Sequence, residues 1–330
     1  MSSSTTSSSL DVPTLERLVA AAGAAPSIHN TQPWRFRLEP DTGTLEIRAA
    51  ADRGLRHIDP AGRALHLSVG CAVFNLRVAV AHFGWEPVTR LLPRPDRPTL
   101  LATVRLAGPA HIAAASGLYD ALWRRHSSRA PFSGRPLPAE VLTELTEAAH
   151  AEGAALAVAA PEVAERVLRV TREAEQRNTA DTDRAAESRR WVQGPEPAAL
   201  GMPPRALGPQ DFRDRIPMRD FGAHRHPAVL AARAYETRPL IAVLSTAHDR
   251  RADWLRAGQA LERVLLVATA HGVRASLLHQ AMEWPDLRAR IGPPASGRRG
   301  HAQMVIRLGY GPEGPASPRR TAREVLTDGW

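Results

Sequence analysis

Hydrophobic residues recur at helical and strand-like spacing along most of this chain. Leu15, Leu18, Val19 and Ala22 fall on one face of a helix, which we predict from 11 to 23. Short apolar and β-branched segments predict strands, and one continuous apolar stretch predicts a long buried helix. In chain order we expect a polar loop (23–33), two strands (34–38 and 45–49) around a turn (41–43), the long helix (62–83) and a strand (100–106).

A similar order of elements recurs 188 residues further along, with a strand, a long helix, a glycine and another strand. Six positions are identical at this offset: Arg63/Arg251, Ala64/Ala252, Leu67/Leu255, Gly70/Gly258, Ala72/Ala260 and Gly84/Gly272. Alanine-rich helices can match by chance, but the shared order of elements favours a duplicated unit. We therefore predict two core helices packed on each other. Gly70 and Gly258 would permit close backbone approach, and Gly84 and Gly272 would cap the helix ends.

The two halves are unequal in length. We predict a disordered polar tail (1–9), a first half (10–110) and a second half (111–330). The second half contains a stretch rich in Pro, Gly, Arg and Asp at about 178–238, which is either disordered or a functional cover. Large apolar side chains favour a cover that packs on the rest of the protein; they are Trp191, Met202, Phe212, Met218 and Phe221.

Composition excludes several kinds of chemistry. Of the 330 residues, 43 are Lys or Arg, and every one of these is arginine, so no lysine can form a Schiff base or bind a phosphate. The net charge of +9 raises nucleic-acid binding as a hypothesis, but the arginines are spread along the chain, as a GC-rich genome would produce. Cys71 is the single cysteine, which excludes an intrachain disulfide and a cysteine-based metal site, and we predict it to be a core residue.

The sequence has no recognisable targeting signal and no recognisable metal-binding pattern. The N-terminus has no apolar segment of a secretory signal, and no window holds 18 consecutive apolar residues, so we expect a cytoplasmic protein without a membrane span. His224 and His226 lack the neighbouring ligands of a metal site. The GYGPEG segment has the wrong spacing for a dinucleotide-binding fingerprint.

Four segments carry candidate binding chemistry. The loop PSIHNTQPW (26–34) is dense in hydrogen-bonding groups, although a structural polar turn closed by proline would have the same composition. RRHSSR (124–129) combines arginines with hydroxyls, as a phosphate site requires, although a solvated basic helix end is the alternative. Taken alone, the segment GVRASLLHQAME (272–283) is an ordinary polar turn. The glycine- and arginine-rich segment 307–326, taken alone, is a basic tail.

Together these segments resemble the nitroreductase superfamily of FMN-binding oxidoreductases, and more closely its actinobacterial Acg-type branch. The resemblance runs from about Leu10 to Leu326 and is weakest over 178–238. It implies an α+β, nitroreductase-like fold, in which two fused units form a pseudo-dimer with central antiparallel or mixed sheets and long core helices. It also implies one FMN per chain, an empty pseudo-symmetric second site, and NAD(P)H as the electron donor.

The resemblance assigns residues of both halves to the flavin. The loop of the first half would lie against the ring, and the second half would hold the phosphate. His279 and Gln280 fall where many relatives have an acidic residue and a glycine beside the flavin. The implied cofactor-binding residues are Ser27, Ile28, His29, Asn30, Thr31, Gln32, Arg125, His126, Ser127, Arg129, His279, Gln280, Ser317, Arg319, Arg320 and Arg323.

Two functions follow from this resemblance. In the first, NAD(P)H reduces the flavin, and a nitro compound, quinone or other electron-poor acceptor is reduced in a second, ping-pong step, with Arg129 stabilising the reduced flavin. In the second, the protein holds a flavin with little turnover. For either function we expect a small-molecule partner, no nucleic acid and no membrane. The active form would be a monomer acting as a pseudo-dimer, or a homodimer of it.

Overall fold

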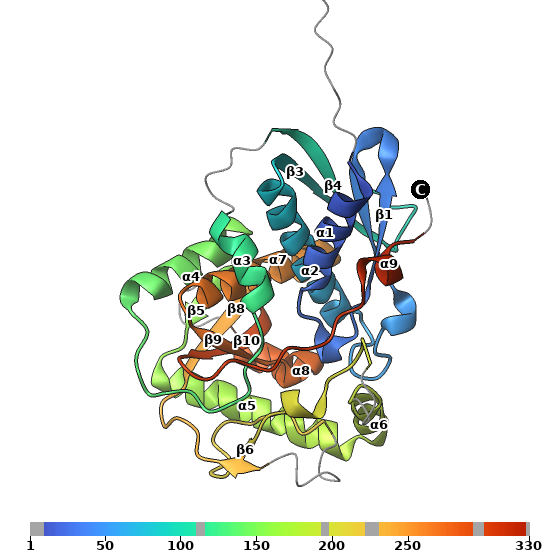
Figure 1. Ribbon diagram of the computed structural model, residues 1–330. Coiled ribbons are helices and arrows are strands. Elements are labelled where there is room, and N and C mark those ends of the chain that lie inside the picture. Colours follow the sequence, from blue (N-terminus) through green and yellow to red (C-terminus); the bar gives the residue numbers. More distant parts are fainter. Residues whose placement is uncertain (1–9, 110–115, 193–197, 222–230, 293–299, 328–330) are drawn as a thin grey trace, which may run out of the picture.

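The computed structural model describes residues 10–109, 116–192, 198–221, 231–292 and 300–327 (Figure 1). The expected disordered tail (1–9) and the His224–His226 pair lie outside these ranges. Over the described residues the fold is α+β, as predicted, and its two larger sheets are antiparallel throughout.

The first sheet follows from alternating apolar residues in its strands. It consists of β1 (Trp34–Glu39), β2 (Thr44–Ala49), β3 (Trp85–Leu91) and β4 (Leu100–Pro109), in the order β1-β2-β4-β3. The β1–β2 register places Phe36 opposite Ile47, and both side chains are fully buried. Helix α2 (Arg63–His82) packs against this sheet, and α1 (Val12–Gly23), whose first turn is capped by Asp11, packs against α2.

The second sheet repeats the connectivity of the first. Its strands are β5 (Ala155–Val158), β8 (Leu240–Thr246), β9 (Arg274–Leu278) and β10 (His301–Gly309), in the order β5-β8-β10-β9. Helices cover both faces of this sheet, so successive residues of β8 enter different cores. Ala242 joins the core around α7 (Arg251–Ala270), whereas Ile241 joins the core beneath α5 (Pro161–Ala180). Three further helices of the second half are α3 (Ser116–Arg124), α4 (Ala139–Ala151) and α8 (Pro285–Ile291).

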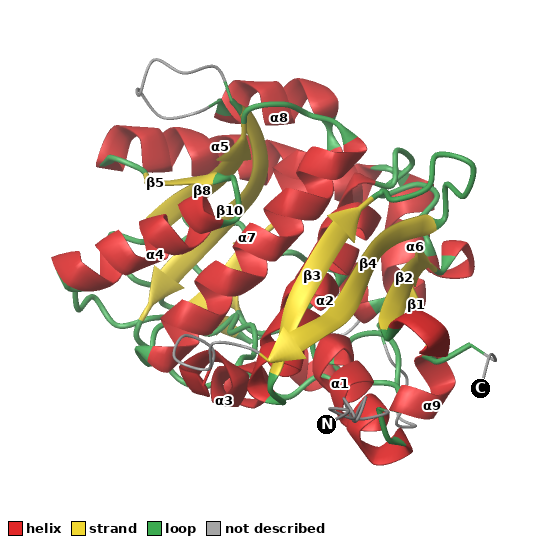
Figure 2. Cartoon of the chain, turned by 90° about the horizontal axis from the view of Figure 1, so that it is seen from above, coloured by secondary structure: helices red, strands yellow, loops and turns green. Residues whose placement is uncertain are grey.

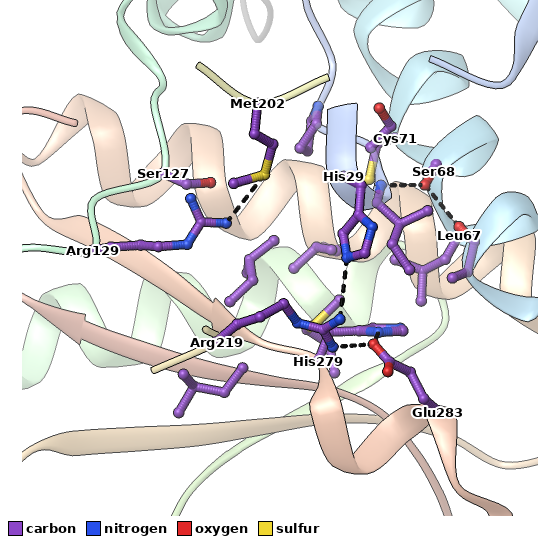
Figure 3. Close-up of a pocket in the computed structure, with 18 of the residues that line it drawn as sticks. His29, Leu67, Ser68, Cys71, Ser127, Arg129, Met202, Arg219, His279 and Glu283 are labelled. Carbon is purple, nitrogen blue, oxygen red and sulfur yellow. Dashed lines mark hydrogen bonds and ion pairs between the residues drawn. The ribbon is translucent and has the colours of Figure 1, made fainter. Parts of the chain in front are cut away.

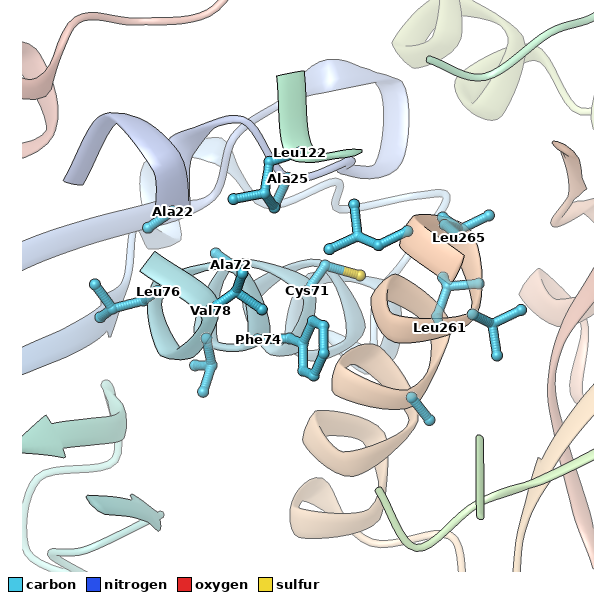
Figure 4. Packing of buried hydrophobic residues seen from close by; sticks show 14 of the residues in the cluster. Ala22, Ala25, Cys71, Ala72, Phe74, Leu76, Val78, Leu122, Leu261 and Leu265 are labelled. Carbon is cyan, nitrogen blue, oxygen red and sulfur yellow. The ribbon is translucent and has the colours of Figure 1, made fainter. Parts of the chain in front are cut away.

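The core helices α2 and α7 cross in close contact, which confirms the prediction that they pack on each other (Figures 1, 2 and 4). A Cβ atom added to Gly70 would lie 2.9 Å from the Cα of Gly258 and closer still to the Leu255 carbonyl oxygen. Only glycine leaves room for this approach. Gly84 and Gly272 follow the two helices with φ angles of 96° and 70°, as helix-ending glycines do. The proposed boundary between halves, at 110/111, stays a prediction.

Helix α2 also meets the length and hydropathy of a membrane-spanning helix, with a mean hydropathy of 1.6 over its most apolar window. Within that window 83% is buried inside the protein, which is the environment of a core helix. The helix therefore belongs to the packed interior, between α1, α7 and the first sheet.

The stretch 178–238 contains helix α6 (Thr182–Arg190) and a small parallel pair, β6 (Gln210–Asp211) and β7 (Ala232–Arg233). The Glu187 carboxylate of α6 accepts hydrogen bonds from three successive backbone N–H groups of the first half, at 56–58. Met202, Met218 and Phe221 are buried, as expected of a cover, but Trp191 is only half-buried and Phe212 is 56% exposed. The prediction that all five large side chains pack is therefore wrong for Phe212.

The C-terminal segment connects the two halves. After β10 it runs back across the molecule to the first sheet, where Leu326 pairs with Phe36 beyond the short helix α9 (Ala322–Val325) (Figure 1). This path carries the basic segment from 317 to 320 past the loop before β1. Strands β3 and β9 were not predicted, because their alternation of apolar and polar residues is weak. Helix α4 was not predicted either, although its buried Val141, Leu145 and Ala148 recur at helical spacing.

Candidate functional site

The loop between α1 and β1 adopts a strained backbone. His29, Asn30 and Gln32 have φ angles of 48°, 54° and 48°, which non-glycine residues seldom adopt. Side chains hold this shape: the Ser27 hydroxyl accepts from the Gln32 backbone N–H at 2.9 Å, and the Ser68 hydroxyl of α2 accepts from the Ile28 N–H at 3.2 Å. The Asn30 amide donates to the carbonyls of Gly201 and Pro318, so the loop is tied to both the insertion and the C-terminal segment.

One end of a cleft beside this loop is strongly cationic. We call it the cationic cavity, and it is lined by Pro26, Ser27, Asn30, Arg125, His126, Ser127, Arg129, Met202, Ala206, Ser317 and Arg319. Arg319 donates to the Asn30 side-chain oxygen at 2.8 Å. Burial, together with the neighbouring charge of Arg125, lowers the pKa of Arg319 to about 9, so Arg319 is a cation at neutral pH. Two adjacent guanidinium groups make this end of the cleft a site for an anion.

The cleft continues into a wider cavity, which shares Pro26, Ser27, Ser127, Arg129 and Met202 with the cationic cavity. The wide cavity has an apolar wall from α2 and β9, including Leu67, Cys71 and Leu277 (Figure 3). Met202, Met218, Arg219 and Phe221 of the insertion form another wall. The cleft is therefore cationic at one end, and its wider part has an apolar wall from α2 and β9.

A buried charge network closes the far side of the wide cavity (Figure 3). Arg219 forms an ion pair with Glu283 and donates to His29 Nε2 at 3.1 Å. His279 contacts Glu283 through Nδ1 at 3.0 Å and accepts from Arg63 through Nε2 at 2.8 Å. Because Arg63 can only donate, the neutral His279 ring carries its proton on Nδ1 and donates it to Glu283.

The pKa values of this network follow from burial and from the pairing of charges. Burial alone would raise the pKa of Glu283, but Arg219 and the hydrogen bond from His279 outweigh it and hold this pKa at about 2. Burial lowers the pKa of His279 to about 4 and that of His29 well below its ordinary value. At neutral pH the carboxylate is charged and both histidines are neutral.

Arg129 differs from Arg219 in having no carboxylate partner among the described residues. It donates to the Ala206 carbonyl at 2.6 Å, and its guanidinium lies 5.1 Å from the Phe221 ring centre. Burial, and then the charge of Arg219, lower the pKa of Arg129 to about 10, so it stays cationic at neutral pH. Its positive charge is available to a molecule in the cleft.

The structure brings together most of the candidate residues named from the sequence. Eleven of them line one or both cavities: Ser27, Ile28, His29, Asn30, Arg125, His126, Ser127, Arg129, His279, Ser317 and Arg319. Arg125 and Ser127 come from one segment and Arg319 from another almost 200 positions later, and they meet because the C-terminal segment packs on the loop after α3.

Five other candidates do not line either cavity. Thr31 is fully buried, and Gln32 and Arg320 bond to each other's backbone and so tie the C-terminal segment to the loop. Gln280 donates to the Pro217 carbonyl, which anchors the insertion. Arg323 is 83% exposed and pairs with Glu16 on the surface, because α9 turns it away from the cleft. For these residues the geometry supports a structural role, because none of them would face a molecule bound in either cavity.

Sequence reasoning missed several residues of the cleft. Arg219 and Glu283 were not named, although Met202, Met218 and Phe221 of the same insertion were expected to cover something. Cys71 is buried, as predicted for a core residue, and it also lines the wide cavity. The α2 residues that line this cavity recur at helical spacing, as Ala64, Leu67, Ser68 and Cys71 do, but this pattern is equally that of a core helix.

Comparisons with known proteins agree on one family. The model of the nitroreductase family matches residues 122–310. A Mycobacterium tuberculosis H37Rv protein named "Putative NAD(P)H nitroreductase Rv3131" is 32% identical over 323 residues, covering 96% of this chain and 92% of the relative. A second protein of that strain, "Putative NAD(P)H nitroreductase acg", is 30% identical over 326 residues, covering 94% and 95%.

Solved structures with a similar fold include an FMN- and NADPH-dependent nitroreductase, NfnB, from Sphigopyxis sp. strain HMH. It is 17% identical, with a TM-score of 0.38, covering 64% of this chain and 99% of that one. A nitroreductase with bound FMN from Desulfitobacterium hafniense is 14% identical, with a TM-score of 0.40, covering 65% and 98%.

Proposed function

Because this chain belongs to the nitroreductase family, we propose that it is an FMN-dependent oxidoreductase. In this proposal NAD(P)H reduces the flavin, and a nitro compound, quinone or other electron-poor acceptor is reduced in a second, ping-pong step. The observation that carries the proposal is the two-part cleft, whose cationic cavity suits a phosphate and whose wide cavity suits a flat, largely apolar ring.

The residues of the cleft fit FMN by their chemistry. Arg125 and Arg319, with the hydroxyls of Ser127 and Ser317, supply donors for a phosphate dianion. The loop 26–30 and the apolar face of α2 would hold the ring, and bound FMN would supply hydride acceptance and electron transfer. Arg129 faces the cleft without a carboxylate partner in the described part of the chain, so its charge would stabilise negative charge on a reduced ring.

The proposal includes the organisation of the chain. Two fused units, 10–110 and 111–330, would each contribute to one flavin site, in a cytoplasmic protein that acts as a monomer or as a homodimer of it. The loop of the first unit and the arginines of the second support this division, because they line the same cleft.

A second candidate function is flavin holding with little turnover. The observation that favours it is the position of the insertion, whose Met202, Met218, Arg219 and Phe221 form a wall of the wide cavity. Such a wall would restrict the access of nicotinamide to the ring.

Absorbance spectra and stopped-flow kinetics test both functions. The purified protein should carry a yellow chromophore that heat releases as FMN, and mixing with NADH or NADPH should bleach it rapidly if the protein is an oxidoreductase. A bound flavin that neither nucleotide bleaches would support the holding function. A protein that lacks flavin and does not bind added FMN would refute both.

The variant Arg125→Ala tests the phosphate assignment. It should lose flavin while its far-UV circular dichroism remains that of the wild type. An Arg125→Ala protein with undiminished FMN content would refute this role for Arg125.

A further inference from the structure

A buried carboxylate lies directly behind the cationic cavity. Glu262 belongs to the middle of α7 and is 0% exposed. Its Oε1 atom lies 3.4 Å from Nε of Arg125, and neither of its oxygens accepts a well-oriented hydrogen bond from the described residues. A carboxylate that is buried and poorly satisfied costs folding free energy, so its presence calls for a physical reason.

Arg125 faces Glu262 and the cavity at the same time. Its Nε atom lies beside Glu262 without an aligned hydrogen bond, one terminal nitrogen donates to the Ala24 carbonyl at 3.3 Å, and the side chain lines the cationic cavity. The guanidinium is therefore shared between the carboxylate inside the protein and any anion that enters the cleft. When both are charged, two negative groups compete for one cation.

We propose that Glu262 is a positioning residue for Arg125 and that it takes up a proton from solvent when a phosphate dianion occupies the cationic cavity. This inference rests on the proposed flavin-phosphate site. In the empty cleft the charged carboxylate would orient Arg125 and offset its charge. When the dianion arrives, protonation of the buried carboxylate removes the competing negative charge and leaves Arg125 to the phosphate.

The groups that face Glu262 allow this exchange near neutral pH. Burial raises the pKa of Glu262 to about 7, against the opposing effect of Arg125. Cys71 and Asn75 face it from α2; burial and the charge of Glu262 raise the pKa of Cys71 well above its ordinary value, so the thiol stays neutral. Arg319, from the C-terminal segment, stays cationic below its pKa of about 9. His126, which lines the cationic cavity, has its pKa lowered by burial and by the charge of Arg125, so its ring is neutral above pH 7. Glu262 is thus the group around Arg125 whose titration falls close to neutral pH.

FMN and riboflavin form a matched pair of ligands for the test, because they differ only in the phosphate. For the wild type we expect FMN affinity to fall between about pH 7 and 8.5, by at most about tenfold per pH unit, while riboflavin affinity stays constant. The phosphate of FMN, with a second pKa near about 6, would by its own ionisation change the affinity in the opposite direction. The variant Glu262→Gln should abolish the pH trend and bind FMN more tightly than the wild type at the upper pH.

A second measurement needs no variant. Calorimetric titrations in buffers of different ionisation enthalpy should show an uptake approaching about one proton per FMN at about pH 8, and none with riboflavin. Glu152→Gln is the matched control, because Glu152 is a buried carboxylate that pairs with Arg77 and Arg263 outside the cleft. This control should keep the wild-type pH trend.

The outcomes separate the two hypotheses. An FMN affinity whose pH trend is the same in wild type and Glu262→Gln, or FMN binding without proton uptake, would overturn the role of Glu262 and leave the flavin site intact. Binding of neither flavin at any pH would instead refute the proposed function, and the role of Glu262 with it.

Discussion

Replacing Glu262 by glutamine should make the stability of the flavin-free protein less dependent on pH. Burial raises the pKa of this carboxyl from its ordinary 4.5 to about 7. Below pH 4.5 the carboxyl is neutral in both folded and unfolded states, whereas above about pH 7 the folded state must hold a buried charge. The stability associated with the neutral carboxyl is therefore lost as the pH rises through this window, and the shift corresponds to about 3 kcal/mol of unfolding free energy.

Urea denaturation followed by far-UV circular dichroism, at about pH 5, 6, 7 and 8, measures this effect as a difference between variant and wild type. Other titrating groups contribute equally to both proteins and cancel in the difference. At about pH 5 the carboxyl is neutral in the folded state but already more than half ionised in the unfolded state, so that comparison gives the effect of the amide together with about 1 kcal/mol of the pH effect. Between about pH 5 and pH 8 the variant should gain about 2 to 3 kcal/mol relative to the wild type. A difference that stays constant across this range would refute the reasoning, because it would show that Arg125 compensates the buried charge fully.

Three further predictions concern packing and pairing. Gly258→Ala should lower the free energy of unfolding by about 3 kcal/mol in urea denaturation, because its Cβ has no room between the core helices. The control Gly23→Ala, whose Cβ meets open space, should not lower it, and equal effects of the two substitutions would contradict the close crossing. Glu283→Gln should cost about 3 to 5 kcal/mol at neutral pH by the same method, since it leaves Arg219 buried without its carboxylate, and an unchanged stability would show that the pair is not formed. Arg323→Ala should change neither the melting temperature nor the flavin content, and a loss of flavin would place this surface residue in the site after all.

Much of the candidate site was predictable because its chemistry is concentrated in short segments. The loop from 26 to 34 and the basic segment from 124 to 129 each contain several hydrogen-bonding or cationic groups within fewer than ten consecutive residues. Their dense composition made them candidate binding segments whatever fold surrounds them. The glycines at 70 and 258 were predictable for a similar reason, since a glycine in each of two similar apolar helices indicates close approach.

Other residues of the cleft carried no local signal. Arg219 and Glu283 belong to unremarkable polar stretches, and they matter because the insertion places one against the other inside the wide cavity. Glu262 is an ordinary position within α7 when the sequence is considered alone. It is completely buried because α2 crosses α7 there and because Arg125, which follows α3, lies beside its carboxylate. Arg323 illustrates the converse, since Arg320 is buried and Arg319 is half-buried, while the capped turn of α9 directs Arg323 to solvent.

The kinds of group in this protein follow from its amino-acid sequence: arginine as the only strong cation, one cysteine, two similar apolar helices and two segments dense in hydrogen-bonding groups. Which of the 43 arginines are buried, paired or facing the cleft depends on the folded arrangement of the chain. Charge and hydrogen-bonding capacity are properties of single residues and can be read locally. Burial and pairing depend on where distant segments meet, and they set the pKa values and free charges on which binding depends.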